Sequence, residues 1–110
     1  MATQKPQKVS VLQEIVSRLV PALEPEAVYL FGSRARKEYG PDSDIDILVV
    51  VPASELPGYE RDRIALRALR GLGVPIDVIV LTRDEFDRKR EVVCSLPATV
   101  LREGTLLYAA

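Results

Sequence analysis

Two aspartates separated by one isoleucine open an apolar segment of this sequence. Asp44 and Asp46 come directly before residues 47–51, which are all apolar, and ten residues separate Asp44 from Gly32-Ser33 at the end of another apolar run. Carboxylates at the start of a buried strand are costly unless a cation neutralises them. A Gly-Ser turn supplies backbone amides that can hold a phosphate group. The arrangement predicts a metal-dependent site for a nucleoside triphosphate.

A third carboxylate, Asp77, lies near the start of a later apolar segment, residues 76–81. Because residues two apart in a strand share a face, Asp44 and Asp46 should point the same way. If the two strands are neighbours, Asp77 joins them, and the three carboxylates suit a two-metal mechanism. One ion would bind the triphosphate and the other would activate an attacking hydroxyl, which Asp77 would orient or deprotonate. The structural alternative makes Asp44 a loop cap and Asp77 the ion-pair partner of an arginine.

Residues that could bind the phosphates follow the first apolar run. Gly32 lets the chain approach a phosphate closely, and Ser33 can cap a following helix whose free amides favour an anion. Arg34 and Arg36 can neutralise the triphosphate charge, and we favour them over Lys37 for this role. The alternative is an ordinary strand-to-helix turn followed by a solvated basic face.

The amino-acid composition limits the chemistry further. The chain has 110 residues, no histidine and one cysteine, Cys94. Without histidine a metal ion must be held by oxygen, which favours Mg²⁺, Mn²⁺ or Ca²⁺ over Zn²⁺. A single cysteine excludes an internal disulfide and is typical of a reducing compartment. We expect Cys94 to lie in a helix on or near the core.

Charge and hydropathy indicate where such a protein works. The formal net charge of −1 argues against a broad basic face, so direct binding of nucleic acid is not expected. Residues 1–8 are polar, and no apolar run approaches the length of a membrane span, which predicts a cytoplasmic protein without membrane contact. The length predicts one domain over residues 1–110, with residues 1–8 flexible.

The periodicity of apolar residues predicts an α/β layered domain. The expected helices cover 9–23, 59–70, 83–94 and 97–103, with a short helix or turn at 33–38 and a loop at 39–43; the expected strands cover 27–31, 45–51, 76–81 and 105–108. Ser10 should cap the first helix, which Pro21 and Pro25 should end. Thr82 and Glu85 have the spacing of a capping box. The charged residues of 61–70, Arg61 among them, are expected on a solvated helix face, and those of 83–91 on a helix surface or at an interface with a partner.

Two segments closely resemble the minimal nucleotidyltransferases of the DNA polymerase beta superfamily. They are Leu30-Phe31-Gly32-Ser33-Arg34-Ala35-Arg36 and Ser43-Asp44-Ile45-Asp46-Ile47-Leu48-Val49. Asp77 matches the third acidic position of that superfamily, and residues 102–108 are similar to its closing segment. The resemblance covers about 9–108. Many relatives have glycine where this chain has Lys37, which alters the turn and leaves the carboxylates intact.

The resemblance implies a small mixed β-sheet flanked by helices, like a polymerase beta palm. It implies transfer of a nucleoside monophosphate from ATP to a hydroxyl, with Mg²⁺ as the cofactor and Asp44, Asp46 and Asp77 as its ligands. It also implies a partner, a small helical HEPN-type toxin whose tyrosine would receive the AMP, so that this chain would act as an antitoxin. The chain could form a hetero-oligomer with this partner or a homo-oligomer.

Two other functions stay open from the sequence. One is a non-catalytic antitoxin that inhibits its partner by binding alone, which the intact set of carboxylates disfavours. The other is a transferase acting on a small molecule of the aminoglycoside type, which the short chain disfavours because little of it is left to build an acceptor pocket.

Overall fold

The computed structural model describes residues 7–32 and 44–110 of the chain. The structure contains α1 (Gln7–Leu23), β1 (Ala27–Phe31), β2 (Ile45–Val51), α2 (Gly58–Ala68), β3 (Ile76–Thr82), α3 (Arg83–Lys89), α4 (Leu96–Glu103) and β4 (Thr105–Ala109). The helix or turn expected at 33–38, the loop expected at 39–43 and the flexibility expected for residues 1–6 lie outside the described residues. Among the described helices, none combines the length and the apolar content that crossing a bilayer requires.

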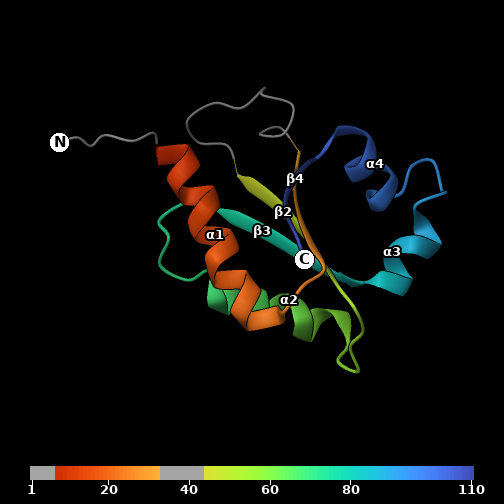
Figure 1. The fold of residues 1–110 in the computed structure, drawn as a ribbon, viewed down its shortest axis with the longest axis horizontal. Coiled ribbons are helices and arrows are strands. Elements are labelled where there is room, and N and C mark those ends of the chain that lie inside the picture. Colours follow the sequence, from red (N-terminus) through yellow and green to blue (C-terminus); the bar gives the residue numbers. More distant parts are fainter. Residues whose placement is uncertain (1–6, 33–43) are drawn as a thin grey trace.

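The four strands form one mixed sheet in the order β3-β2-β1-β4. Strand β1 is antiparallel to both β2 and β4, whereas β2 and β3 are parallel. Figure 1 shows α1 and α2 on one side of this sheet and α3 and α4 on the other. The expected α/β class, with a small mixed sheet flanked by helices, is therefore confirmed.

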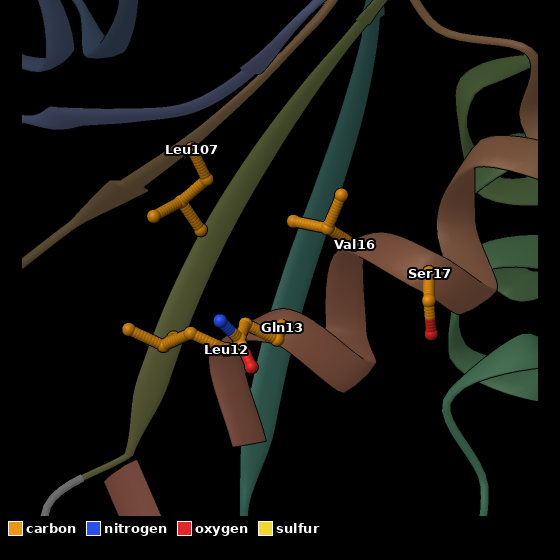
Figure 2. Close-up of a pocket in the computed structure, with 5 residues that line it drawn as sticks. All are labelled: Leu12, Gln13, Val16, Ser17 and Leu107. Carbon is orange, nitrogen blue, oxygen red and sulfur yellow. The ribbon is translucent and has the colours of Figure 1, made fainter. Parts of the chain in front are cut away.

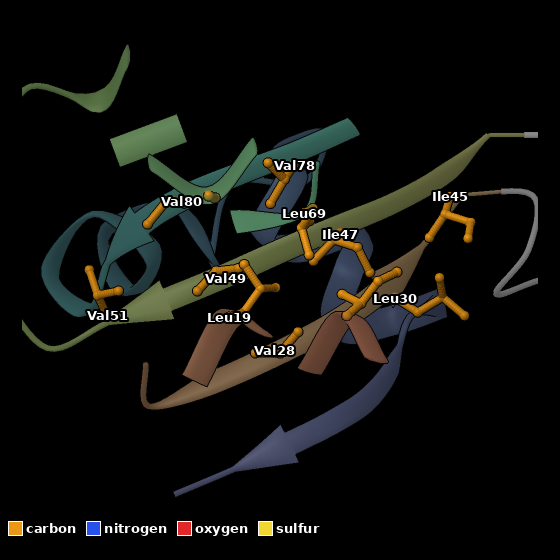
Figure 3. Close-up of a cluster of buried hydrophobic side chains, with 12 residues drawn as sticks. Leu19, Val28, Leu30, Ile45, Ile47, Val49, Val51, Leu69, Val78 and Val80 are labelled. Carbon is orange, nitrogen blue, oxygen red and sulfur yellow. The ribbon is translucent and has the colours of Figure 1, made fainter. Parts of the chain in front are cut away.

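Apart from Asp46, strand β2 is apolar, because both of its faces are covered. On the α1 and α2 side, Ile45 and Ile47 pack with Ile15 and Leu19 in the larger buried cluster (Figure 3). On the α3 and α4 side, Leu48 packs into a second cluster around Phe86 and Val100. The alternation of side chains along the strand thus joins two apolar layers through one element.

The ends of α1 differ from the prediction. The helix begins at Gln7, so Ser10 lies inside it rather than at its cap. Pro21 also lies inside the helix. The last turn continues past this proline because other amides still bond, with Glu24 N donating to Val20 O at 2.8 Å.

The third helix is shorter than predicted, and this changes the position of Cys94. Helix α3 ends at Lys89 instead of near residue 94, and Ser95 starts α4 by accepting a hydrogen bond from Ala98 N. Cys94 lies in the turn between the two helices and is exposed. The prediction of a cysteine on or near the core was therefore wrong.

Arg61 was also predicted wrongly as part of a solvated face. It is only 5% exposed, and its Nη2 donates to Glu85 Oε1 at 2.9 Å. The signal that identifies its position is a spacing of four residues: Arg61, Ala65 and Leu69 are all buried, so the arginine belongs to the helix face that packs on the sheet.

Candidate active site

The strand register brings two of the predicted carboxylates together. Asp46 in β2 is the Cα partner of Asp77 in β3, which meets the expectation that these strands are neighbours. Because the strands are parallel and the residues are paired, both side chains project from the same face of the sheet, the one that α3 and α4 cover further along. Asp46 is half-buried, and Asp77, near the start of β3, is exposed.

Asp44 lies just before β2 and is exposed, yet it affects the same site. Burial raises the pKa of the Asp46 carboxyl above its usual value, and the negative charges of Asp77 and Asp44 raise it further. Like charges have this effect only at short range, because solvent and salt screen distant pairs. All three aspartates therefore contribute to one region of negative potential.

Gly32 closes this region from the side of β1. Its neighbour Phe31 is the Cα partner of Asp46, and Gly32 has a φ of 78°, a conformation that side chains disfavour. A Cβ atom added at Gly32 would overlap Asp46 Oδ2. The backbone thus passes directly against the central carboxylate, and only glycine leaves room for both.

Oxygen ligands of this kind suit a hard divalent cation. Within residues 7–32 and 44–110, Asp44, Asp46 and Asp77 make no hydrogen bond or ion pair that would neutralise them. In the same part of the chain, no group of three or more acidic or cysteine side chains is gathered tightly enough to hold a metal ion. The carboxylates fit a cation by chemistry and charge, and sharing one ion among all three would require their side chains to turn toward each other.

The remaining predicted site residues cannot be placed. Ser33, Arg34 and Arg36, expected to bind the phosphates, lie outside the described residues, as does Lys37. The predicted site residues that the structure does describe, Asp44, Asp46, Asp77 and Gly32, lie in one region.

Among the cavities bounded by described residues are three whose walls do not include the aspartates of this region. One of about 270 Å³ lies between α1 and β4, where Leu12, Val16 and Leu107 form an apolar hollow (Figure 2). One of about 430 Å³ lies against the second half of β3. The third, of about 190 Å³, lies near Leu23 and Leu56.

Comparison with known proteins shows the family to which the chain is related. Residues 9–103 match the profile of the nucleotidyltransferase domain family. A relative from Methanocaldococcus jannaschii, which carries the name protein adenylyltransferase, is 38% identical over 81 residues, or 74% of this chain and 76% of the relative.

Solved structures give the same result for the fold. A crystal structure from Sulfolobus solfataricus, described as a nucleotidyltransferase, is 30% identical and superposes with a TM-score of 0.66 over 99% of this chain and 92% of that one. A structure described as a toxin–antitoxin complex with AMP-PNP is 24% identical, with a TM-score of 0.66 over 90% of this chain and 73% of that one. At that identity the second likeness concerns the fold alone.

Proposed function

The chain belongs to the nucleotidyltransferase domain family, and from this membership we propose that it transfers AMP from ATP to a protein hydroxyl. The observation that carries the proposal is the pairing of Asp46 with Asp77 across two parallel strands, beside a glycine whose lack of a side chain leaves room for the Asp46 carboxylate. The adenylyltransferase name of the archaeal relative supports the choice of AMP and of a protein acceptor.

The proposed acceptor is a tyrosine of a HEPN-type helical toxin, which this chain would silence as its antitoxin. Support comes from the resemblance of the two motif segments and from the shared fold of a toxin–antitoxin complex. A partner chain that brings the hydroxyl would complete the site.

In the proposed reaction, the acceptor oxygen forms a bond to the α-phosphorus while the bond from that phosphorus to pyrophosphate breaks. Asp77, which is exposed near the start of β3, orients the acceptor hydroxyl and takes its proton. Mg²⁺ held by Asp44, Asp46 and Asp77 would supply the positive charge that offsets the triphosphate. Gly32, Ser33, Arg34 and Arg36 would position the phosphates, with the close passage of Gly32 keeping the nucleotide near Asp46.

The test is transfer of label from α-³²P-ATP to the proposed HEPN-type partner. Asp46→Asn keeps the size of the side chain and removes its charge, so we expect labelling to fall at least about a hundredfold. Asp84→Asn is the matched control, because Asp84 is an exposed aspartate of α3 whose ion pair is with Arg88. It should label the partner as the parent chain does.

The outcomes separate the proposal from its rivals. Label on the partner that depends on Asp46 and on Mg²⁺ supports protein adenylylation. A tight complex without label, in which the Asp46→Asn variant still neutralises the toxin, would overturn it in favour of inhibition by binding alone.

A further inference from the structure

The sheet has two edge strands, β3 and β4, and their outer edges differ. On β3, side chains from neighbouring helices bond outward backbone amides. Val80 N donates to Asp62 Oδ1 at 2.8 Å, and Thr82 N donates to Glu85 Oε1 at 2.9 Å. Proteins commonly protect the edges of their sheets, because an open edge can pair with another chain. The edge of β3 is protected in this way by α2 and α3.

Strand β4 lacks such protection. Among residues 7–32 and 44–110, no further strand and no side chain bonds its outer edge. The strand reads Thr-Leu-Leu-Tyr-Ala over Thr105–Ala109, without the charged side chains or proline that discourage pairing on other edge strands. Its Leu106 is 53% exposed. The outer edge of β4 is therefore open, uncharged and largely apolar.

The hydrogen bonds to β1 show which backbone groups of β4 face outward. Ala110 N donates to Glu26 O at 2.9 Å. Because bonding groups alternate along an antiparallel strand, the N–H and C=O of Ala109 point away from β1. The same alternation directs the backbone groups of Tyr29 toward β2, so those of its partner Leu106 also point outward. The register shift in this ladder places the two outward residues three positions apart instead of two.

The side chains of β4 divide in a matching way between the two faces of the sheet. Leu106 and Ala109 pair with residues of β1 that pack with the cluster around Phe86, on the α3 and α4 side. Leu107 and Tyr108 pack against the larger cluster, on the α1 and α2 side. Positions 106 and 109 thus share one face, and positions 107 and 108 share the other.

A second copy of the chain matches this edge. Consider a two-fold axis between positions 107 and 108, with the two strands antiparallel. Leu106 then lies opposite Ala109 of the second copy, which brings the outward backbone groups of both residues together as a hydrogen-bonded pair. Leu107 lies opposite Tyr108 of the second copy. In both pairs the opposing side chains lie on the same face, as cross-strand packing requires, and no charge opposes the contact.

The apolar hollow between α1 and β4 is compatible with the same occupant. It has a volume of about 270 Å³, and Leu12, Val16 and Leu107 are among the residues that line it (Figure 2). Because Tyr108 of the second copy would lie opposite Leu107, its ring would approach this hollow from the outer edge of the sheet. Removing these apolar side chains and the exposed Leu106 from water would stabilise the pair.

We propose that two copies of this chain associate through β4, antiparallel to each other, with Leu106 opposite Ala109 of the second copy. The two four-stranded sheets would form one continuous sheet. The assembly stops at two copies, because each uses its open edge and the edge of β3 is protected. This surface goes beyond the proposed transfer reaction and does not depend on it.

Sedimentation velocity of the full chain over a range of concentrations tests the association, with a reductant present because Cys94 is exposed. We expect a reversible equilibrium between monomer and dimer. Leu106→Lys places a charge on the open edge and should weaken the dimer at least about tenfold. Leu66→Lys is the matched control, since Leu66 is 46% exposed on α2, and its dissociation constant should equal that of the parent chain.

Ala109→Pro tests the backbone pairing. Proline removes the outward N–H of this exposed residue and leaves the bonds to β1 in place, so the fold should tolerate it. Each dimer loses two hydrogen bonds, and we expect it to weaken about tenfold. A urea unfolding midpoint close to that of the parent chain would show that association rather than folding has changed.

A pair of cysteines tests the register, in a Cys94→Ser background with oxidised glutathione as the oxidant. Leu106→Cys/Ala109→Cys should form disulfides between two copies, because opposing residues of a hydrogen-bonded pair have Cα atoms about 5.5 Å apart. Leu106→Cys alone is the control. Its counterpart in the second copy is displaced by three residues along the strand, about 10 Å, which is too far for a disulfide.

Three results would each overturn the proposal. The first is a parent chain that stays monomeric at every concentration. The second is a dimer whose dissociation constant is the same in the parent chain, in Leu106→Lys and in Ala109→Pro. The third is equal cross-linking of the single-cysteine and double-cysteine variants, which would place the contact elsewhere or in another register.

Discussion

At the scale of single residues, the central carboxylate depends on its immediate neighbours. Asp46 carries a raised pKa because burial and two nearby aspartates oppose its charge, and the backbone at Gly32 leaves it no space on one side. The opposed charge of Asp46 and its crowding by Gly32 are unfavourable for the protein without a ligand. They favour the binding of a cation and of a phosphate group. The residue is thus more useful for ligand binding than for the stability of the fold.

Replacing Gly32 by alanine tests this crowding. The added Cβ overlaps Asp46 Oδ2, so we expect label transfer to fall about a hundredfold, because small displacements of reacting groups have effects of this size. The positive φ should add about 1–2 kcal/mol of destabilisation in urea unfolding. Gly71→Ala is the matched control, since Gly71 has a φ of 89° and open space around its Cβ position. Equal losses of activity in both variants would contradict a specific role for Gly32.

The raised pKa of Asp46 predicts a pH dependence of stability. The folded protein holds this proton more tightly than the unfolded chain, so stability falls as pH rises from about 4 through the raised folded pKa. The Asp46→Asn variant lacks this loss. In metal-free buffer its free energy of unfolding, relative to the parent, should therefore increase from pH 4 toward pH 7. A difference that stays constant with pH would show that the shift is absent.

At the scale of elements, one ion pair holds α2 against the start of α3. Glu85 caps its own helix by accepting from Thr82 N and also binds Arg61 from α2. Hydrogen bonds from the Thr82 backbone and from Arg61 lower the pKa of Glu85, which keeps it charged. A short helix of seven residues is thereby fixed at the end of β3.

We expect Glu85→Ala to cost about 2–4 kcal/mol in urea unfolding, because it removes a capping box and leaves Arg61 buried without its partner. Asp84→Ala, next to it in sequence, breaks an exposed pair with Arg88 and should cost less than about 1 kcal/mol. Similar costs for the two variants would mean that the Arg61 pair adds nothing to stability.

At the scale of the whole molecule, two apolar layers share one central strand. Consecutive residues of β2 enter opposite clusters, with Ile47 facing α1 and α2 and Leu48 facing Phe86 of α3. Loss of packing in either layer would expose one apolar face of β2. We therefore infer that the sheet and the described helices on its two faces unfold together.

Truncations on the two faces of β2 test this coupling. Ile47→Ala and Leu48→Ala, both fully buried, should each cost about 2–5 kcal/mol and lower the midpoint of one shared transition. Leu66→Ala, an exposed leucine of α2, should change the midpoint little. Circular dichroism and tyrosine fluorescence should follow the same curve. Two separated transitions in either core variant would show that the layers unfold independently.

The sequence alone predicted most of the elements and led to the hypothesis of a carboxylate site. Strands 27–31 and 45–51 were predicted with their observed bounds, and Asp44, Asp46 and Asp77 were identified before any pairing was known. These features depend on short-range patterns: alternation along a strand, turn residues, and polar groups in apolar runs. Such patterns involve residues that lie close together in the sequence.

The tertiary structure decided which elements meet. Only the parallel pairing of β2 with β3 brings Asp46 opposite Asp77, and only the packing of α2 on the sheet buries Arg61 beside Glu85. The exposure of Cys94 likewise follows from the early end of α3. Each of these features depends on contacts between residues far apart in the sequence. A local sequence pattern does not give the free energies of such contacts.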